Sequence, residues 1–213
     1  MRPPAKPSSF FYQPLDSIIG TVGMVRVLRV LSLQRGGMTA SAIAIRAGLG
    51  KPGTGRVLER LNAVGMVEAS GTGRSPQYQL AEHHRLALAI RQLFEREAER
   101  IDRFLERIRA AARRMKPVPK AVWLVGSVAR GRDTVQSDVD LAIVQTNASM
   151  EGLRSFNSMV VRAADELGLT ISLVAFTPQD LERHSKSQSE WWRNLVADAI
   201  PVLGPAPRSL IGG

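Results

Sequence analysis

The sequence VWLVGSVARGRDTVQSDVDLAIV, residues 122–144, decides the fold of the C-terminal half. It overlaps two short apolar runs, 121–125 and 139–144, which are rich in valine, leucine and isoleucine. Runs of this length, bounded by glycine and polar residues, are typical of buried β-strands. We therefore expect two strands, separated by a tight turn with the sequence GSVARG, at the core of a C-terminal domain.

Polar residues at the ends of these runs suggest a nucleotide site. Gly126 and Ser127 follow the first run, where a glycine and a small hydroxyl let backbone N–H groups approach a triphosphate. Asp138 and Asp140 begin the second run at positions i and i+2, which project from one face of a strand. Two carboxylates so placed can chelate Mg²⁺ together with nucleotide phosphates. Arg130 is a candidate for a further phosphate contact.

This order of Gly-Ser, ten residues and Asp-x-Asp resembles the nucleotidyltransferase superfamily that includes DNA polymerase beta, and within it the minimal nucleotidyltransferases. The likeness extends over about 120–204, because ISLVAFTPQDLERHSKSQSEWWRNLVADAIPVLG is similar to the family's last strand, its Thr-Pro-x-x-Leu helix start and its closing turn. It implies a mixed sheet flanked by helices, and a nucleoside triphosphate with Mg²⁺ as cofactors. The implied metal ligands and catalytic residues are Asp138 and Asp140, and the implied cofactor-binding residues are Gly126, Ser127 and Arg130.

The resemblance also implies a third carboxylate on the strand expected at 170–176, where it completes the metal site and helps to deprotonate the attacking hydroxyl. Ser172 stands at that position. A serine hydroxyl is neutral and cannot act as a general base at physiological pH. We therefore expect a domain that binds nucleotide and Mg²⁺ with weak or no transferase activity. Another acid could replace the missing one, and the candidates are Asp133, Asp165, Asp180 and Glu182.

A second motif fills the N-terminal half. Its parts are TASAIAIRAGLG, RVLERLNAVGMVEAS and GTGRSPQYQL, within residues 39–80. Apolar periodicity and glycine stops predict helices and strands in this order: helices over 15–33, 39–47 and 52–64, and strands over 66–70 and 77–80. The motif resembles the winged helix-turn-helix family of bacterial and archaeal regulators over about 15–82. The resemblance implies binding of double-stranded DNA, usually as a dimer.

The charge distribution favours the same partner. Residues 1–116 hold 20 Lys/Arg against 9 Asp/Glu, whereas residues 117–213 hold 9 against 10. Such asymmetry points to a polyanion that binds the first half. The expected DNA contacts are Lys51, Thr54, Arg56 and Arg60 on the outer face of the third helix, and Arg74 in the wing loop. A protein-interaction role stays open, because Glu59 would repel phosphate and Gly53 and Gly55 each cost the helix about 1 kcal/mol.

A long helix is expected between the two motifs, over about 81–115. Its apolar residues follow a seven-residue spacing that Glu97 interrupts. This stripe could form the seam of a homodimer or pack against its own chain. The expected α+β chain thus has a flexible arm (1–14), a winged helix-turn-helix domain (15–82), a connecting helix (83–116), a nucleotidyltransferase-like domain (117–204) and a tail (205–213).

Three functions remain after these observations. The first is a DNA-binding transcriptional regulator with a nucleotide-binding domain. The second is an active metal-dependent nucleotidyltransferase, for example an antitoxin-like protein that adenylylates a protein partner. The third is a structural adaptor. The sequence contains no cysteine, which excludes disulfides and thiolate zinc sites. No apolar run is long enough for a membrane span or a secretory signal, so we expect a cytoplasmic location.

Overall fold

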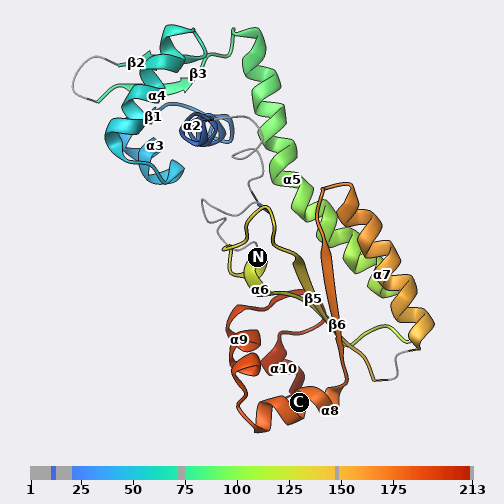
Figure 1. The fold of residues 1–213 in the computed structure, drawn as a ribbon. Helices are drawn as coiled ribbons and strands as arrows, with labels where there is room; N and C mark the ends of the chain where they lie inside the picture. Colours follow the sequence, from blue (N-terminus) through green and yellow to red (C-terminus); the bar gives the residue numbers. More distant parts are fainter. Residues whose placement is uncertain (1–10, 13–20, 72–74, 147–148, 212–213) are drawn as a thin grey trace. The chain divides into compact units, whose positions relative to one another are not determined.

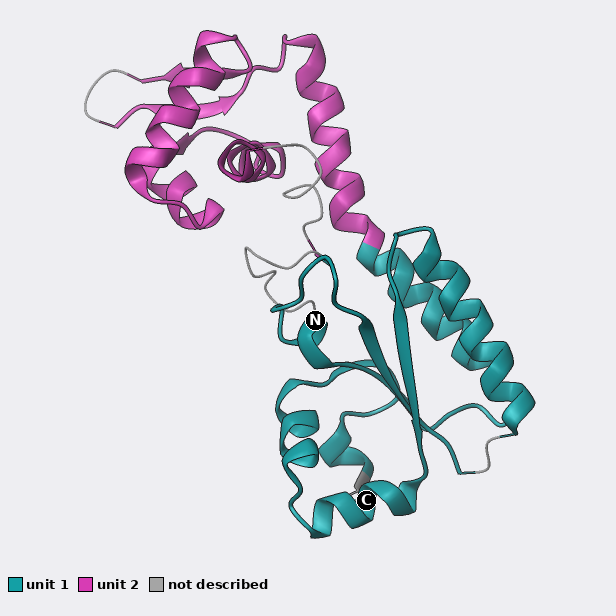
Figure 2. Ribbon diagram, in the orientation of Figure 1, with its two compact units in different colours: residues 1–11, 101–213 teal, residues 12–100 magenta. Residues whose placement is uncertain are grey.

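The computed structural model describes residues 11–12, 21–71, 75–146 and 149–211. The chain forms two compact units, one of residues 12–100 (unit 2) and one of residues 1–11 and 101–213 (unit 1), as Figure 2 shows. The division falls within helix α5 (Arg85–Arg114), which contributes to both units. None of the described helices is both long enough and apolar enough to cross a bilayer.

Unit 2 has the helices and strands expected of the second motif (Figure 1). They are α2 (Val22–Ser32), β1 (Met38–Thr39), α3 (Ala40–Ala47), α4 (Lys51–Ala63), β2 (Val67–Ser70) and β3 (Gln77–Leu80). The antiparallel strands lie in the order β1-β3-β2. Strand β1 was not predicted, because two residues are too few for an alternating pattern. The first predicted helix began at residue 15, and its part before residue 21 lies outside the described residues.

Local signals fix the ends of the helices in unit 2. Thr39 caps α3 by accepting a hydrogen bond from the Ala42 N–H at 3.3 Å. Gly48 ends that helix in the left-handed conformation, with φ of 62°. Ile43 of α3 and Leu58 of α4 are both buried in the core of this unit.

Glu97 interrupts the apolar stripe of α5 because it pairs with Arg29 of α2. The Arg29 Nε donates to Glu97 Oε2 at 2.6 Å, and Nη2 donates to Oε1 at 3.1 Å. The guanidinium also lies 5.3 Å from the centre of the Phe94 ring. Both charged side chains are at least nine-tenths buried. The stripe is therefore used inside unit 2 along this part of α5.

Unit 1 is a four-stranded mixed sheet covered by helices. Its elements after α5 are β4 (Ala121–Val125), α6 (Gly126–Ala129), β5 (Val139–Val144), α7 (Met150–Asp165), β6 (Ile171–Phe176), α8 (Pro178–Lys186), α9 (Glu190–Asp198), β7 (Ile200–Leu203) and α10 (Pro207–Ile211). The strand order is β6-β5-β4-β7. Strands β5 and β6 are parallel, and the other two pairs are antiparallel. The fold class is α+β, as expected.

The two faces of this sheet carry different helices. Helices α8, α9 and α10 lie on one side of it, and α7 with the C-terminal part of α5 lies on the other (Figure 1). On the first face Trp123 and Ala142 pack against Leu181 and Trp192. Because side chains alternate along a strand, Asp140 shares this face with Ala142.

Two parts of unit 1 differ from the sequence-based expectation. Helix α10 lies within the expected tail, whereas α8 begins at the Thr-Pro-x-x-Leu sequence as the resemblance implies. In the expected flexible arm, the structure describes Phe11 and Tyr12, and both are buried. The Phe11 N–H donates to Asp133 Oδ2 at 2.6 Å, and its ring lies edge-on to Phe104 at 5.9 Å. These contacts anchor Phe11 to unit 1.

Candidate functional site

The turn after β4 places a glycine backbone against a carboxylate. Gly126 has a φ of +74°, which favours glycine. A Cβ at this position would overlap Asp140 Oδ2 and would lie 3.0 Å from Asp140 Cγ. The backbone of Gly126 therefore packs directly on the Asp140 side chain, and no larger residue fits there. Ser127 follows in the short helix α6, and its carbonyl accepts the Arg132 N–H at 2.9 Å.

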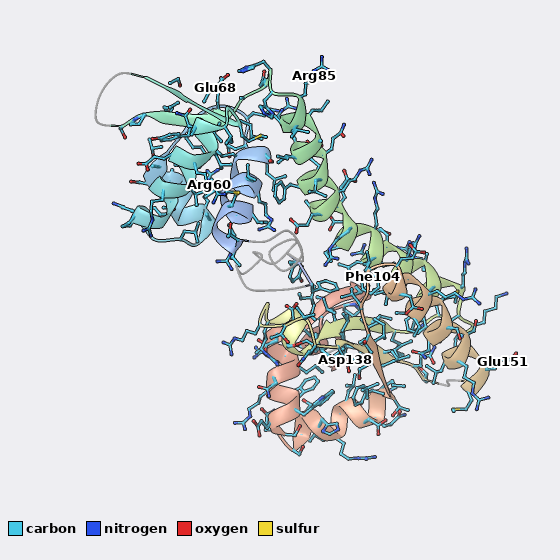
Figure 3. The ribbon with its side chains drawn as sticks, turned by 45° about the horizontal axis from the view of Figure 1, so that its top comes forward. Arg60, Glu68, Arg85, Phe104, Asp138 and Glu151 are labelled. Atoms are coloured by element: carbon cyan, nitrogen blue, oxygen red, sulfur yellow. The ribbon has the colours of Figure 1, made fainter. Side chains whose placement is uncertain are left out.

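The two aspartates lie at the start of β5, as the sequence predicts. Asp138 directly precedes the strand and is exposed, whereas Asp140 lies on it and is half-buried. Figure 3 labels Asp138 within unit 1. Val139 between them is fully buried. Because neighbouring strand residues point to opposite faces, the two carboxylates point away from Val139 on a common face.

Ser172 lies directly beside Asp140. The parallel pairing of β5 with β6 brings these two residues into register. The Ser172 hydroxyl interacts with the Asp140 carboxylate and stabilises its ionised form, which lowers the pKa of that carboxyl. The position at which the resemblance implies a third carboxylate therefore faces the site, and its side chain is a neutral hydrogen-bond donor.

The surroundings of Asp140 disfavour its ionised form. Burial raises the pKa of the Asp140 carboxyl above its ordinary value, and the nearby Asp138 carboxylate raises it further. The Ser172 hydroxyl and the Arg130 guanidinium lower the same pKa, but burial and the Asp138 carboxylate prevail. A divalent cation would favour ionisation of Asp140 and relieve its repulsion from Asp138. This donor set of two carboxylates fits Mg²⁺, which prefers oxygen ligands.

Arg130 caps helix α6 beside this site and has a partner that the sequence did not reveal. Its Nη1 lies 3.4 Å from Asp198 Oδ2 at the end of α9. The two residues are 68 positions apart, so no local pattern could have paired them. The ion pair orients the guanidinium expected to contact phosphate.

The four acids considered as substitutes do not complete a metal site. Among the residues that the structure describes, no group of three or more His, Cys, Asp or Glu side chains could hold a metal ion. Asp133 is buried and accepts the Phe11 N–H. Asp180 caps α8 through Thr177, and Glu182 lies 3.9 Å from Lys186 on the same helix.

The expected DNA contacts on α4 need one correction. Lys51, Arg56 and Arg60 are exposed, in agreement with the expected outer face. Thr54 is fully buried, and its hydroxyl donates to the Gly50 carbonyl at 3.2 Å. Its expected role in DNA contact was therefore wrong. The physical reason is spacing, because Thr54 shares the buried stripe of the helix with residues four and seven positions later. The expected wing residue Arg74 lies outside the described residues.

One family model and several solved structures match parts of this chain. Residues 105–191 match the family model described as "Nucleotidyltransferase domain". No curated protein matches the sequence. One similar solved structure is a MarR-family transcriptional regulator from Silicibacter pomeroyi, with 20% identity and a TM-score of 0.34, covering 43% of this chain and 64% of that chain. Another is human N-acetylserotonin methyltransferase in complex with SAM, with 11% identity and a TM-score of 0.28, covering 46% and 33%.

The chain spans less than two thirds of the length of either solved structure, and neither likeness is close enough to support an argument. The family match is of a different kind, because it covers the glycine turn, both aspartates and Ser172. The matched region begins within α5 and ends within α9. This part of the chain therefore matches a nucleotidyltransferase domain in sequence.

Proposed function

We propose that the nucleotidyltransferase domain binds a magnesium–nucleoside triphosphate complex and transfers the nucleotidyl group weakly or not at all. We further propose that the winged domain binds double-stranded DNA, so that the chain acts as a nucleotide-responsive transcriptional regulator. The observation that carries the first proposal is the position of the neutral Ser172 directly beside Asp140, in register across β5 and β6.

Asp138 and Asp140 would hold the metal, because both carboxylates lie on one face at the start of β5. When bound, Mg²⁺ supplies positive charge that orients and neutralises nucleotide phosphates. Gly126 leaves room beside Asp140 for backbone to approach a phosphate, and Arg130 offers a guanidinium. Ser172 provides no base to accept a proton from an attacking hydroxyl. The residues therefore support binding better than transfer.

The test measures binding and transfer separately in the full chain. Calorimetry with ATP and Mg²⁺ should show binding that Asp140→Asn weakens at least about tenfold, a change of about 1.4 kcal/mol. The matched control is Asp165→Asn, which removes an exposed carboxylate at the end of α7. Incubation with α-labelled ATP should leave the protein and added acceptors unlabelled. If the wild-type chain does not bind ATP in the presence of Mg²⁺, the proposal is refuted.

The active nucleotidyltransferase is the second candidate, and the intact pair of Asp138 and Asp140 beside Gly126 favours it. In this case the acceptor would be a protein partner, a nucleic acid or a small molecule. Magnesium-dependent transfer of label that Asp138→Ala abolishes would establish this function in place of the first. Transfer that survives Asp138→Ala would instead indicate a contaminating enzyme.

The DNA-binding proposal rests on unit 2 and its surroundings in the sequence. Lys51, Arg56 and Arg60 are exposed on α4, and residues 1–116 hold all the excess positive charge. Exposed cations on one helix are suited to phosphates along a duplex. We also propose that the protein acts as a homodimer, since a duplex offers two-fold related half-sites.

A further inference from the structure

Gly53 occupies a helical position that packing does not reserve for glycine. Its φ is not positive, and an added Cβ would meet no described atom within 4 Å. Alanine would fit there and would stabilise α4 by about 1 kcal/mol. Helix α4 is therefore less stable with glycine at this position than it would be with alanine. Gly53 borders a pocket, and the missing side chain keeps that pocket open.

The pocket lies between α2 and α4, and we call it the α2–α4 pocket. Its lining is mostly apolar and comes from Gly23, Met24, Leu49, Gly53 and Val57. Its volume is about 340 Å³. This volume is within the range of roughly 300–1,000 Å³ that is usual for small-molecule sites. Burial of a hydrocarbon group against this apolar lining would be favourable in free energy.

Two arginines on α4 also line the pocket. Arg56 and Arg60 are four positions apart, so their side chains lie one above the other on the same helix face. Figure 3 labels Arg60 on this helix. Both are exposed, and within the described part of the chain neither guanidinium forms an ion pair. An apolar pocket with two such cations matches a ligand that joins an apolar body to an anionic end.

We propose that the α2–α4 pocket binds a small amphipathic carboxylate. Its apolar body lies against Met24, Leu49 and Val57, and its carboxylate accepts hydrogen bonds from Arg56 and Arg60. Guanidinium groups bind carboxylates in a planar, two-point geometry. An inorganic anion would leave the apolar lining uncovered, and a neutral hydrocarbon would leave the arginines unpaired. The combined lining selects for a ligand with both parts.

Occupancy of the pocket opposes DNA binding, and this part rests on the proposed function of unit 2. Arg56 and Arg60 are among the side chains proposed to meet phosphates. A carboxylate held by the same guanidinium groups competes with those phosphates. The apparent dissociation constant for DNA then rises in proportion to one plus the ratio of the free ligand concentration to the ligand's own dissociation constant, as linked equilibria require.

The test uses 2-naphthoate as the probe and 2-naphthamide, its neutral analogue, as the charge control. Calorimetry on the full chain without DNA should detect 2-naphthoate binding and at least about tenfold weaker binding of the amide. Gly53→Leu fills the pocket from α4, and Gly23→Leu fills it from α2. Each should weaken 2-naphthoate binding at least about tenfold. Gly55→Leu is the matched control, because its Cβ also meets nothing described within 4 Å and it lies outside the lining.

The outcomes separate the site from the proposed function. Equal binding of the amide and the carboxylate, or unchanged binding in both filled variants, would overturn the site. Competition is then measured by fluorescence anisotropy of a labelled duplex, with and without saturating 2-naphthoate. If the probe binds and DNA does not, the site stands and the DNA-binding function fails. If both bind together without mutual weakening, competition is refuted.

Discussion

Ser172 and Asp140 face each other in register across the parallel strands β6 and β5, and the serine hydroxyl lowers the pKa of the aspartate carboxyl. A strand pair in register brings side chains of one face within direct reach of each other. A carboxylate in place of Ser172 would therefore lie next to Asp140 without any change of backbone. The proposed loss of transfer thus depends on one side chain.

Ser172→Asp should restore magnesium-dependent transfer. The new carboxylate adds both a metal ligand and a proton acceptor, and general bases usually contribute about 10²–10⁴-fold to rate. We expect transfer from α-labelled ATP to rise at least about tenfold above wild type, toward the lower end of that range. Ser172→Asn is the control, because it has nearly the same shape and no charge. Equal activity of the two variants would contradict a missing carboxylate as the cause.

Binding of the full chain to duplex DNA should weaken steeply as salt rises. Each phosphate neutralised releases counterions and adds about 0.9 to the slope of log affinity against log salt. Replacing the exposed Lys51 by Gln should lower that slope by about one unit, as anisotropy titrations can measure. Lys186→Gln on α8 is the matched control and should leave it unchanged. If the chain does not bind duplex DNA even at low salt, the DNA-binding role is excluded.

Removing Glu97 should destabilise unit 2 selectively. Glu97→Leu removes the two oxygens that bind the buried Arg29 guanidinium, which should cost about 3–5 kcal/mol. The double variant with Arg29→Leu should recover part of this loss. All three tryptophans lie in unit 1, so their fluorescence reports that unit alone, whereas far-UV circular dichroism reports both. In urea unfolding, the transition followed by circular dichroism should shift to lower urea concentration, whereas the transition followed by fluorescence should not. Exposed ion pairs contribute less than about 1 kcal/mol to the free energy of unfolding. A decrease this small in the Glu97→Leu variant would contradict the role of the pair as a buried ion pair.

The cap of α8 should make stability depend on acid pH. Hydrogen bonds from the Thr177 hydroxyl and backbone N–H lower the pKa of the Asp180 carboxyl below its ordinary value. The folded state therefore binds this proton less readily than the unfolded state does. The stabilisation is present above the ordinary pKa of an aspartate and is lost as pH falls through the folded value.

Asp180→Asn should flatten this part of the pH dependence. Thermal melts followed by tryptophan fluorescence, from about pH 6 to about pH 3, would compare the variant with wild type. The curves should differ most at the higher pH and converge in acid. Asp165→Asn is the control at an exposed acid outside this cap. If the melting temperatures of variant and wild type differ by the same amount at every pH, the cap of α8 is not the source of the pH dependence.

Local rules predicted much of the fold. The strand Ala121–Val125 and the strand Val139–Val144 have the bounds expected from their apolar runs. Thr39 and Gly48 delimit α3 as capping chemistry requires. The same rules placed Asp138 and Asp140 at the start of their strand. These features depend on neighbours within a few residues, and the sequence displays such neighbours directly.

Long-range pairings escaped prediction because their partners lie far apart in the sequence. Asp198 meets Arg130 from a helix near the C-terminus, and Asp133 meets Phe11 from a loop 122 residues away. Glu97 interrupts an apolar stripe in the sequence, and only the structure shows that Arg29 lies beside it. Thr54 is different, since its spacing from Leu58 and Leu61 already indicated burial. Its polar side chain can be buried because the Gly50 carbonyl accepts its proton.

Gly126 has a consequence for how this domain can change over evolution. Its positive φ and its contact with Asp140 are two separate barriers to any side chain, so mutation there would damage the turn and the carboxylate together. Position 172 carries no such barrier, and exchanging its side chain leaves the turn intact. A lineage can therefore gain or lose chemistry at residue 172 while it inherits the same nucleotide cradle. If the proposed function holds, phosphate binding is kept where transfer is lost, and the transfer reaction stays one substitution away.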